Sequence, residues 1–143
     1  MIFAFWKGHE LERKARILIV DDEAVFCGSL AAALQKLGYE TYMATNGQKA
    51  LDLIRKVAPD LMTLDIMMPG ESMMPAMNGL HVLTEMRKTN KTMPVIIISA
   101  AELAEDEGSF ISMGAQAVHR KPVDFPSLFA TIGSLLDRRL FKT

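Results

Sequence analysis

Near its start the chain reads Ile-Leu-Ile-Val-Asp-Asp over residues 17–22, where four apolar residues lead directly into two aspartates. A short, uninterrupted apolar run of this kind is typical of a strand that is buried on both faces of a parallel sheet. Comparable runs occur at 61–64 and 94–98, and the first of these also ends directly in an acidic residue, Asp65. The three runs therefore predict the central strands of one sheet.

Segments with apolar residues at helical spacing alternate with these runs. Helices are expected over about 24–37, from the N-cap Asn46 to just before Pro59, around 80–86, over about 103–113 and from 125 to about 137–140. Weaker runs at 41–44 and 117–118 suit the two edges of a sheet. Five strands that alternate with five helices predict an α/β fold, a doubly wound parallel sheet with helices on both faces. Strong inner and weak outer strands favour the flavodoxin-like strand order 2-1-3-4-5.

Length and composition indicate a single globular domain. The chain has 143 residues, of which 50% are hydrophobic and 23% charged, and its formal net charge is -1. We expect an N-terminal extension over residues 1–14 and one domain over residues 15–143. The charge argues against direct binding of nucleic acid, and no apolar run approaches the roughly 20 residues needed for membrane insertion. The single cysteine, Cys27, cannot form an internal disulfide, which fits a cytoplasmic location.

The residues that follow the predicted strands are the candidates for a site, because ligands of such sheets bind at the carboxyl ends of the strands. These residues are Asp21 and Asp22 after the first strand, Asp65 after the third, Ser99 after the fourth and Lys121 after the fifth. Three neighbouring carboxylates resist ionising together, and an all-oxygen set of ligands suits Mg²⁺. An aspartate can also act as a nucleophile and form an acyl phosphate, whose charge a metal and a lysine can neutralise.

Each candidate also has an ordinary structural explanation when it is taken alone. Asp21 and Asp22 could cap the first helix, and Asp65 could begin a turn. Ser99 could be a turn or cap residue, and Lys121 could be a solvated surface charge. Because all five are expected on one edge of the sheet, the functional interpretation is favoured.

The motifs in this order resemble the receiver domains of bacterial-type response regulators. The matching stretches are Ile-Leu-Ile-Val-Asp-Asp at 17–22, Leu-Asp-Ile-Met-Met-Pro at 64–69, Ile-Ile-Ile-Ser-Ala at 96–100, Gly-Ala at 114–115 and Lys-Pro at 121–122. The resemblance extends from about residue 16 to about residue 140, which is nearly the whole chain. It implies a phosphorylated signalling switch of a two-component system rather than an enzyme that acts on other molecules.

The resemblance also implies a role for each site residue. Asp65 would be the phosphoacceptor. Mg²⁺ would be held by Asp22, by Asp21 through water, by Asp65 and by the backbone carbonyl of Met67. Ser99 and Lys121 would contact the phosphoryl group, and the Lys121–Pro122 peptide bond would be cis.

The implied partners are proteins. A histidine kinase or a phosphotransfer protein would donate the phosphoryl group. A downstream protein would bind the face formed by the fourth helix, the fifth strand and the fifth helix, and a homodimer is left open. No further domain is expected after the last helix, unless the chain is an excised piece of a longer protein.

Two features depart from the family pattern. After Pro69 the expected Asn78-Gly79 comes about six residues late, because Met-Met-Pro followed by a small residue occurs twice and lengthens the loop at 70–76. The position three before the lysine is often aromatic in the family, but here it is Val118. The next residue, His119, is expected at the surface. The sequence therefore does not identify the residue that couples phosphorylation of Asp65 to the protein surface.

Three alternatives remain at this stage. A receiver-like adaptor that works without phosphate is mildly favoured by Val118 and by the longer loop, and disfavoured by the complete set of site residues. The methionines at 67, 68, 73, 74 and 77 could bind Cu(I), although methionine also commonly fills apolar gaps. A flavin-binding redox protein is disfavoured because no glycine-rich phosphate loop follows the first strand.

Overall fold

The computed structural model describes residues 13–66, 79–100 and 107–141, the last four of them as backbone only. The strands are β1 (Arg16–Val20), β2 (Glu40–Ala44), β3 (Leu61–Asp65), β4 (Val95–Ser99) and β5 (Ala117–Arg120). The helices are α2 (Ala24–Lys36), α3 (Gly47–Val57), α4 (Gly79–Arg87), α5 (Glu107–Ser112) and α6 (Phe125–Phe141). None of the helices in the described parts of the chain is long and apolar enough to cross a membrane.

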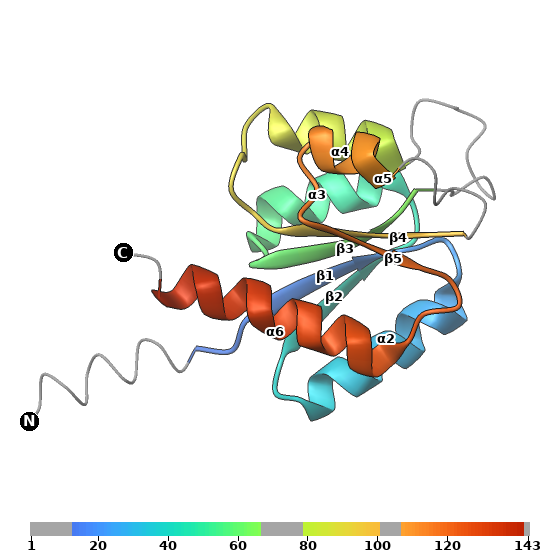
Figure 1. The fold of residues 1–143 in the computed structure, drawn as a ribbon, viewed down its shortest axis with the longest axis vertical. Coiled ribbons are helices and arrows are strands. Elements are labelled where there is room, and N and C mark those ends of the chain that lie inside the picture. The colour runs from blue at the N-terminus through green and yellow to red at the C-terminus, as the bar shows by residue number, and fades with distance from the viewer. Residues whose placement is uncertain (1–12, 67–78, 101–106, 142–143) are drawn as a thin grey trace, which may run out of the picture.

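The five strands form one parallel sheet in the order β2-β1-β3-β4-β5. Helices α2 and α6 cover one face, and α3, α4 and α5 cover the other (Figure 1). This arrangement confirms the predicted doubly wound fold and its strand order.

Burial follows the position of each strand in the sheet. All five residues of β3 and of β4 are buried, and so are the last four of β1, because helices cover both faces of these inner strands. The edge strands β2 and β5 are mostly half-buried. Continuous apolar runs therefore formed the centre of the sheet, and the two weaker runs formed its edges.

The helix ends agree with the sequence where the structure describes them. The side chain of Asn46 accepts a hydrogen bond from the Lys49 amide at 2.8 Å and caps α3 as predicted. Helix α2 ends at Lys36, and Gly38 follows with a φ of 97°, a conformation that glycine adopts without strain. The first part of the predicted 103–113 helix lies outside the described residues, and α5 is described from Glu107.

Candidate functional site

The register of the sheet brings the predicted site residues to one edge. Val20 pairs with Leu64, so the residues after β1 lie beside the end of β3. Asp65 pairs with Ile98 of β4, and Ser99 pairs with Arg120 of β5. Asp21, Asp22, Asp65, Ser99 and Lys121 therefore meet at the carboxyl ends of the strands, as predicted. Met67, whose carbonyl was expected to bind the metal, lies outside the described residues.

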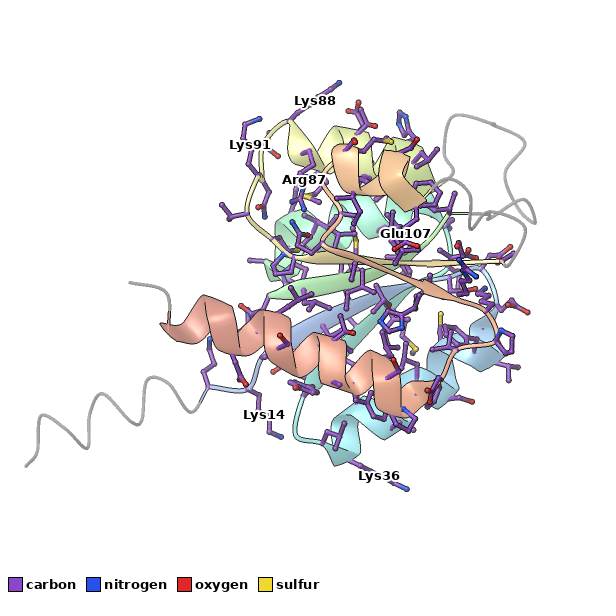
Figure 2. All side chains as sticks on the ribbon, viewed as in Figure 1. Lys14, Lys36, Arg87, Lys88, Lys91 and Glu107 are labelled. Carbon is purple, nitrogen blue, oxygen red and sulfur yellow. The ribbon has the colours of Figure 1, made fainter. Side chains whose placement is uncertain are left out.

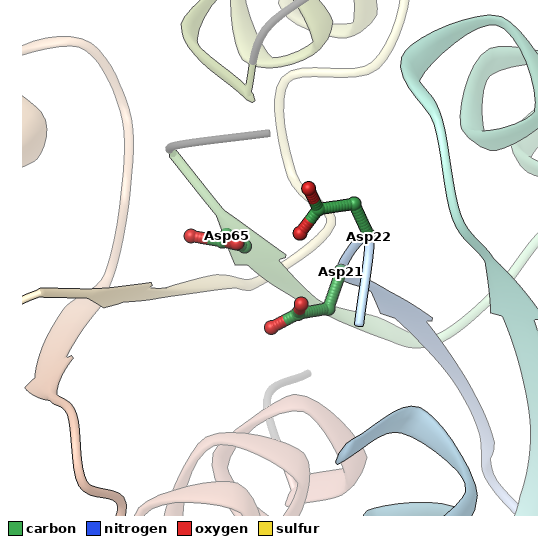
Figure 3. Close-up of side chains that lie close together, drawn as sticks. All are labelled: Asp21, Asp22 and Asp65. Atoms are coloured by element: carbon green, nitrogen blue, oxygen red, sulfur yellow. The ribbon is translucent and has the colours of Figure 1, made fainter. Parts of the chain in front are cut away.

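Three carboxylates converge at this edge (Figure 3). One oxygen from each of Asp21, Asp22 and Asp65 lies within 4.8 Å of the other two. The Asp21 and Asp65 side chains are buried, with 1% and 3% of each residue exposed, whereas Asp22 is half-buried. A close all-oxygen set of acidic ligands fits a hard divalent cation such as Mg²⁺. These residues could therefore hold the metal that the sequence predicts.

Two hydrogen bonds, one to each carboxylate oxygen, hold the Asp21 side chain in place. Its Oδ1 accepts a hydrogen bond from the Glu23 amide at 2.9 Å, and its Oδ2 accepts one from the Lys121 ammonium at 3.0 Å. Burial raises the pKa of Asp21, and these two contacts offset the increase only in part. The ionised form of Asp21 would therefore gain from a further positive charge in the site.

The interpretation of Asp21 and Asp22 as helix caps is wrong. The N-cap of α2 is Glu23, and no side chain makes a capping hydrogen bond there. The paired aspartates instead lie in the loop before the helix, with Asp21 directed into the site.

Lys121 is directed into the site as its only cation among the described residues. Its Nζ lies 3.0 Å from Asp21 Oδ2, 3.3 Å from Glu23 Oε1 and 3.5 Å from Asp65 Oδ2. Lys36 and Lys88, by contrast, extend away from the body of the protein (Figure 2). Burial would lower the pKa of Lys121, but the hydrogen bond and charge of Asp21 and the charge of Asp65 outweigh burial and raise it. Lys121 therefore stays protonated.

The backbone places this ammonium. The Lys121–Pro122 bond is cis, which confirms the expectation from the resemblance. The Lys121 amide donates to the carbonyl of Ser99 at 2.7 Å, so the residue after β5 is tied to the end of β4. On its outer side Lys121 borders an open hollow of about 410 Å³, which is lined by Glu23, Val25, Phe26, Lys121, Pro122, Val123 and Phe125. The lysine is thus reachable from solvent, although the Asp21 and Asp65 carboxylates beneath it are buried.

The hydroxyl of Ser99 has no hydrogen-bond partner among the described residues, although the residue is fully buried. Buried hydroxyl groups nearly always have a partner, so an unpaired one at a strand end requires an explanation. A ligand oxygen that enters the site would supply the missing acceptor.

Gly79 brings the chain back to the site after the lengthened loop. Its amide donates to the carbonyl of Ile66 at 3.2 Å, so the two ends of the 67–78 segment are joined. A Cβ atom at Gly79 would overlap the backbone carbonyl oxygen of Asp65, which leaves no room for a side chain. Gly79, the second residue of the late Asn-Gly pair, therefore lies against the backbone of Asp65, and the loop at 70–76 lies outside the described residues.

Three further residues of interest lie near this edge or on β5. The Cys27 thiol is buried and donates to the Asp21 carbonyl at 3.2 Å, and burial raises its pKa to about 11, so it is a poor nucleophile. Val118 is half-buried and packs against the core under α3, α4 and α5. His119, which was expected at the surface, is half-buried with Nε2 2.9 Å from Thr131 Oγ1, and burial lowers its pKa.

Glu23 and Phe26 are contacts of the site that the sequence interpretation missed. Glu23 pairs with Lys121, and the Lys121 Nζ lies 5.4 Å from the centre of the Phe26 ring. The available signal was their position directly after the paired aspartates, at the start of the helix that borders the site.

Comparison with known families matches residues 17–133 to the response regulator receiver domain. The chain belongs to this family. Receiver domains are signalling switches of two-component systems rather than classical enzymes, and they interact with histidine kinases and downstream effectors. Membership in this family disfavours the flavin-binding interpretation and does not favour the adaptor interpretation.

Curated relatives of this receiver domain are longer proteins. A probable transcriptional regulatory protein of Picosynechococcus sp. is 35% identical over 135 residues, which are 92% of this chain and 53% of that protein. The response regulator MprA of Mycolicibacterium vanbaalenii is 33% identical over 123 residues, which are 86% of this chain and 51% of that protein. The chain thus spans about half the length of the curated relatives that it matches.

Solved receiver domains have the same fold over almost their whole length. The receiver domain of NtrX from Brucella abortus is 33% identical, with a TM-score of 0.77 over 85% of this chain and 98% of that one. A CheY-like receiver domain protein from Methanospirillum hungatei is 28% identical, with a TM-score of 0.78 over 88% of this chain and 96% of that one.

Proposed function

We propose that this receiver domain is a Mg²⁺-dependent switch that is phosphorylated on Asp65. The observation that carries the proposal is the convergence of three carboxylates and one protonated lysine at a single strand edge. Asp21, Asp22 and Asp65 would hold the metal together with the backbone carbonyl of Met67. We further propose that residues 15–143 form the domain and residues 1–14 an extension, which the family match at 17–133 supports.

The phosphoryl donor would be a phosphohistidine of a histidine kinase or of a phosphotransfer protein. A carboxylate oxygen of Asp65 would form a bond to phosphorus while the phosphorus–nitrogen bond breaks and its electron pair stays on the imidazole. Lys121 would keep its proton and pair with a phosphoryl oxygen, and Ser99 would donate its free hydroxyl hydrogen to another. The bound metal would neutralise part of the negative charge on the carboxylates and the phosphoryl group.

The added negative charge would change the face formed by α5, β5 and α6. These elements are the fourth helix, fifth strand and fifth helix of the sequence interpretation. The backbone bond from Lys121 to Ser99 links the site directly to β5. On this face Ile111 and Met113 expose 45% and 38% of their surface. A downstream protein in the cytoplasm, or a second copy of the chain, would bind here rather than nucleic acid. Because Val118 replaces the usual aromatic residue, any coupling through this position would involve a smaller side chain.

The test is labelling with acetyl phosphate and Mg²⁺, followed by intact and peptide mass spectrometry. We expect one added phosphoryl group on Asp65, which is lost in Asp65→Asn and when EDTA replaces Mg²⁺. Asp60→Asn is the matched control, because Asp60 is also a buried aspartate but directly precedes β3, at the opposite end of the strand from Asp65. A phosphoryl group on another residue would contradict the assignment, and no label at all would favour the adaptor alternative.

A further inference from the structure

Glu23 gives Lys121 a third carboxylate partner, and this partner differs from the other two. The Glu23 side chain is 66% exposed, whereas those of Asp21 and Asp65 are 1% and 4% exposed. Its Oε1 lies 3.3 Å from the Lys121 Nζ, on the side of the open hollow. The ammonium is therefore shared between two buried carboxylates and one carboxylate in contact with solvent.

The side chain of Glu23 has no other role in the described structure. Its backbone is fixed, because the amide donates to Asp21 Oδ1 at 2.9 Å and the carbonyl accepts from the Cys27 amide at 3.1 Å. Glu23 is the N-cap of α2, a position that favours Ser, Thr, Asp or Asn, yet its carboxylate makes no capping bond. A change of the side chain should therefore leave the start of the helix intact.

We propose that Glu23 is a positioning residue that competes with the phosphoryl group for Lys121 and so restrains the phosphorylation of Asp65. This inference rests on the proposed function. An ammonium has three hydrogens to donate, and Lys121 faces three carboxylates with them. A phosphoryl oxygen on Asp65 needs one of these hydrogens. The contact with Glu23 is the one to open, because water can solvate the exposed Glu23 carboxylate but cannot reach the buried Asp21 and Asp65 carboxylates in the same way.

The negative charge of Glu23 should also slow the phosphorylation of Asp65, in addition to the competition for Lys121. A phosphodonor is an anion, and Glu23 adds a negative charge on the side from which Lys121 is reachable. Repulsion between exposed charges weakens with salt. The Phe26 ring, 5.4 Å from the Lys121 Nζ and in edge contact with Phe125, keeps the ammonium on this side of the site.

The experiment measures the rate at which acetyl phosphate labels Asp65 at a subsaturating donor concentration and saturating Mg²⁺. We expect Glu23→Gln to be labelled about two- to fivefold faster than wild type, which is the effect expected for an exposed ion pair. Glu23→Asp keeps the charge but is one methylene shorter, so its rate should fall between the two. Glu85→Gln is the matched control, since it makes the same change in the exposed Lys88–Glu85 pair on α4 and should label like wild type.

Three further readouts separate competition from a structural effect. The affinity for beryllofluoride, a stable mimic of the phosphoryl group, should rise in Glu23→Gln by the same factor as the labelling rate. The gain should shrink in high salt, and the thermal unfolding midpoint should not change. A rate and an affinity equal to those of Glu85→Gln would overturn the inference, and so would a wild-type rate in Glu23→Asp. If the wild-type protein itself is not labelled, the proposed function fails instead.

Discussion

The two ends of the sheet each bury an aspartate at a strand terminus, but they balance its charge differently. At the amino end, Asp60 accepts from the Arg13 guanidinium at 3.1 Å and from the Arg16 amide at 2.8 Å. The Asp60 amide donates in return to the Arg16 carbonyl at 2.8 Å, so the clamp joins the starts of β1 and β3 in both directions. At the carboxyl end, Asp21, Asp22 and Asp65 lie together, and Lys121 is the only cation paired with Asp21 and Asp65 among the described residues.

This difference distinguishes an acid that stabilises the fold as it stands from the acids of the proposed metal site. The carboxylate of Asp60 is matched by a cation and by a half-buried backbone donor, so it stabilises the fold as it stands. At the other end the three aspartates outnumber the one cation of the described residues, and this excess of negative charge destabilises the protein until another positive charge arrives. An excess of buried acid at one edge is thus a physical sign of a site that binds a cation.

The largest expected change in the free energy of unfolding comes from replacing Asp60 at the amino end of the sheet. Asp60→Ala should lower the free energy of unfolding by about 2–4 kcal/mol, because it removes a buried carboxylate and leaves the half-buried Arg16 amide and the Arg13 guanidinium without their charged acceptor. Urea denaturation would measure this loss, and labelling of Asp65 should continue under native conditions. The control is Asp52→Ala, which breaks the exposed Arg55–Asp52 pair and should change stability by less than about 0.5 kcal/mol. Equal losses in the two variants would show that Asp60 is not a clamp.

A slightly smaller change in the free energy of unfolding is expected when Mg²⁺ neutralises the three aspartates at the carboxyl end of the sheet. Mg²⁺ at a hundredfold excess over its dissociation constant should raise the free energy of unfolding by about 2.7 kcal/mol, because the ion binds only the folded site. Urea denaturation with Mg²⁺ and with EDTA measures the difference. Most of the gain should be lost in Asp22→Asn, while Asp60→Asn should keep it. A full response in Asp22→Asn would place the ion at another site.

The smallest effect concerns Asp21 and pH in the absence of metal. Folding raises the pKa of Asp21 above its ordinary value of 3.8. At a pH between this ordinary value and the raised pKa, the folded protein therefore holds a proton on Asp21 that the unfolded chain has released. The contribution of Asp21 to the free energy of unfolding therefore falls as pH rises through this range. Urea denaturation from pH 4 to 7 in EDTA should show a flatter decline in Asp21→Asn, and this variant should be the more stable at pH 7. Asp52→Asn should follow wild type, and an unchanged slope in Asp21→Asn would contradict the assignment.

Patterns within short segments of the sequence predicted most of the fold. The run at 17–20 predicted an inner strand because both faces of that strand must be apolar, and burial confirmed it. The weaker run at 41–44 predicted an edge strand for the converse reason, and β2 is mostly half-buried. The partial burial of His119 could not be predicted in this way, because a side chain on an edge strand can face either solvent or a helix, and His119 contacts Thr131 of α6.

The contacts within the site could be predicted only in part. Asp21, Asp65, Ser99 and Lys121 were found because parallel strands place their carboxyl ends together. Glu23 was missed, since its ion pair with Lys121 joins residues 98 positions apart and depends on where a cis bond and a helix start place two side chains. The clamp at Asp60 was missed for a similar reason, because its partners lie 44 and 47 positions away.

The sequence by itself determined the order of the elements, the inner and outer strands and the set of residues at the carboxyl edge. Those features follow from the burial of continuous segments and from a general rule of parallel sheets. Only the tertiary structure decided which acids share Lys121, which aspartate is balanced by arginine and which buried hydroxyl has no partner in the described part of the chain. These depend on distances of a few ångströms between side chains from distant segments, which the packing of the whole sheet sets.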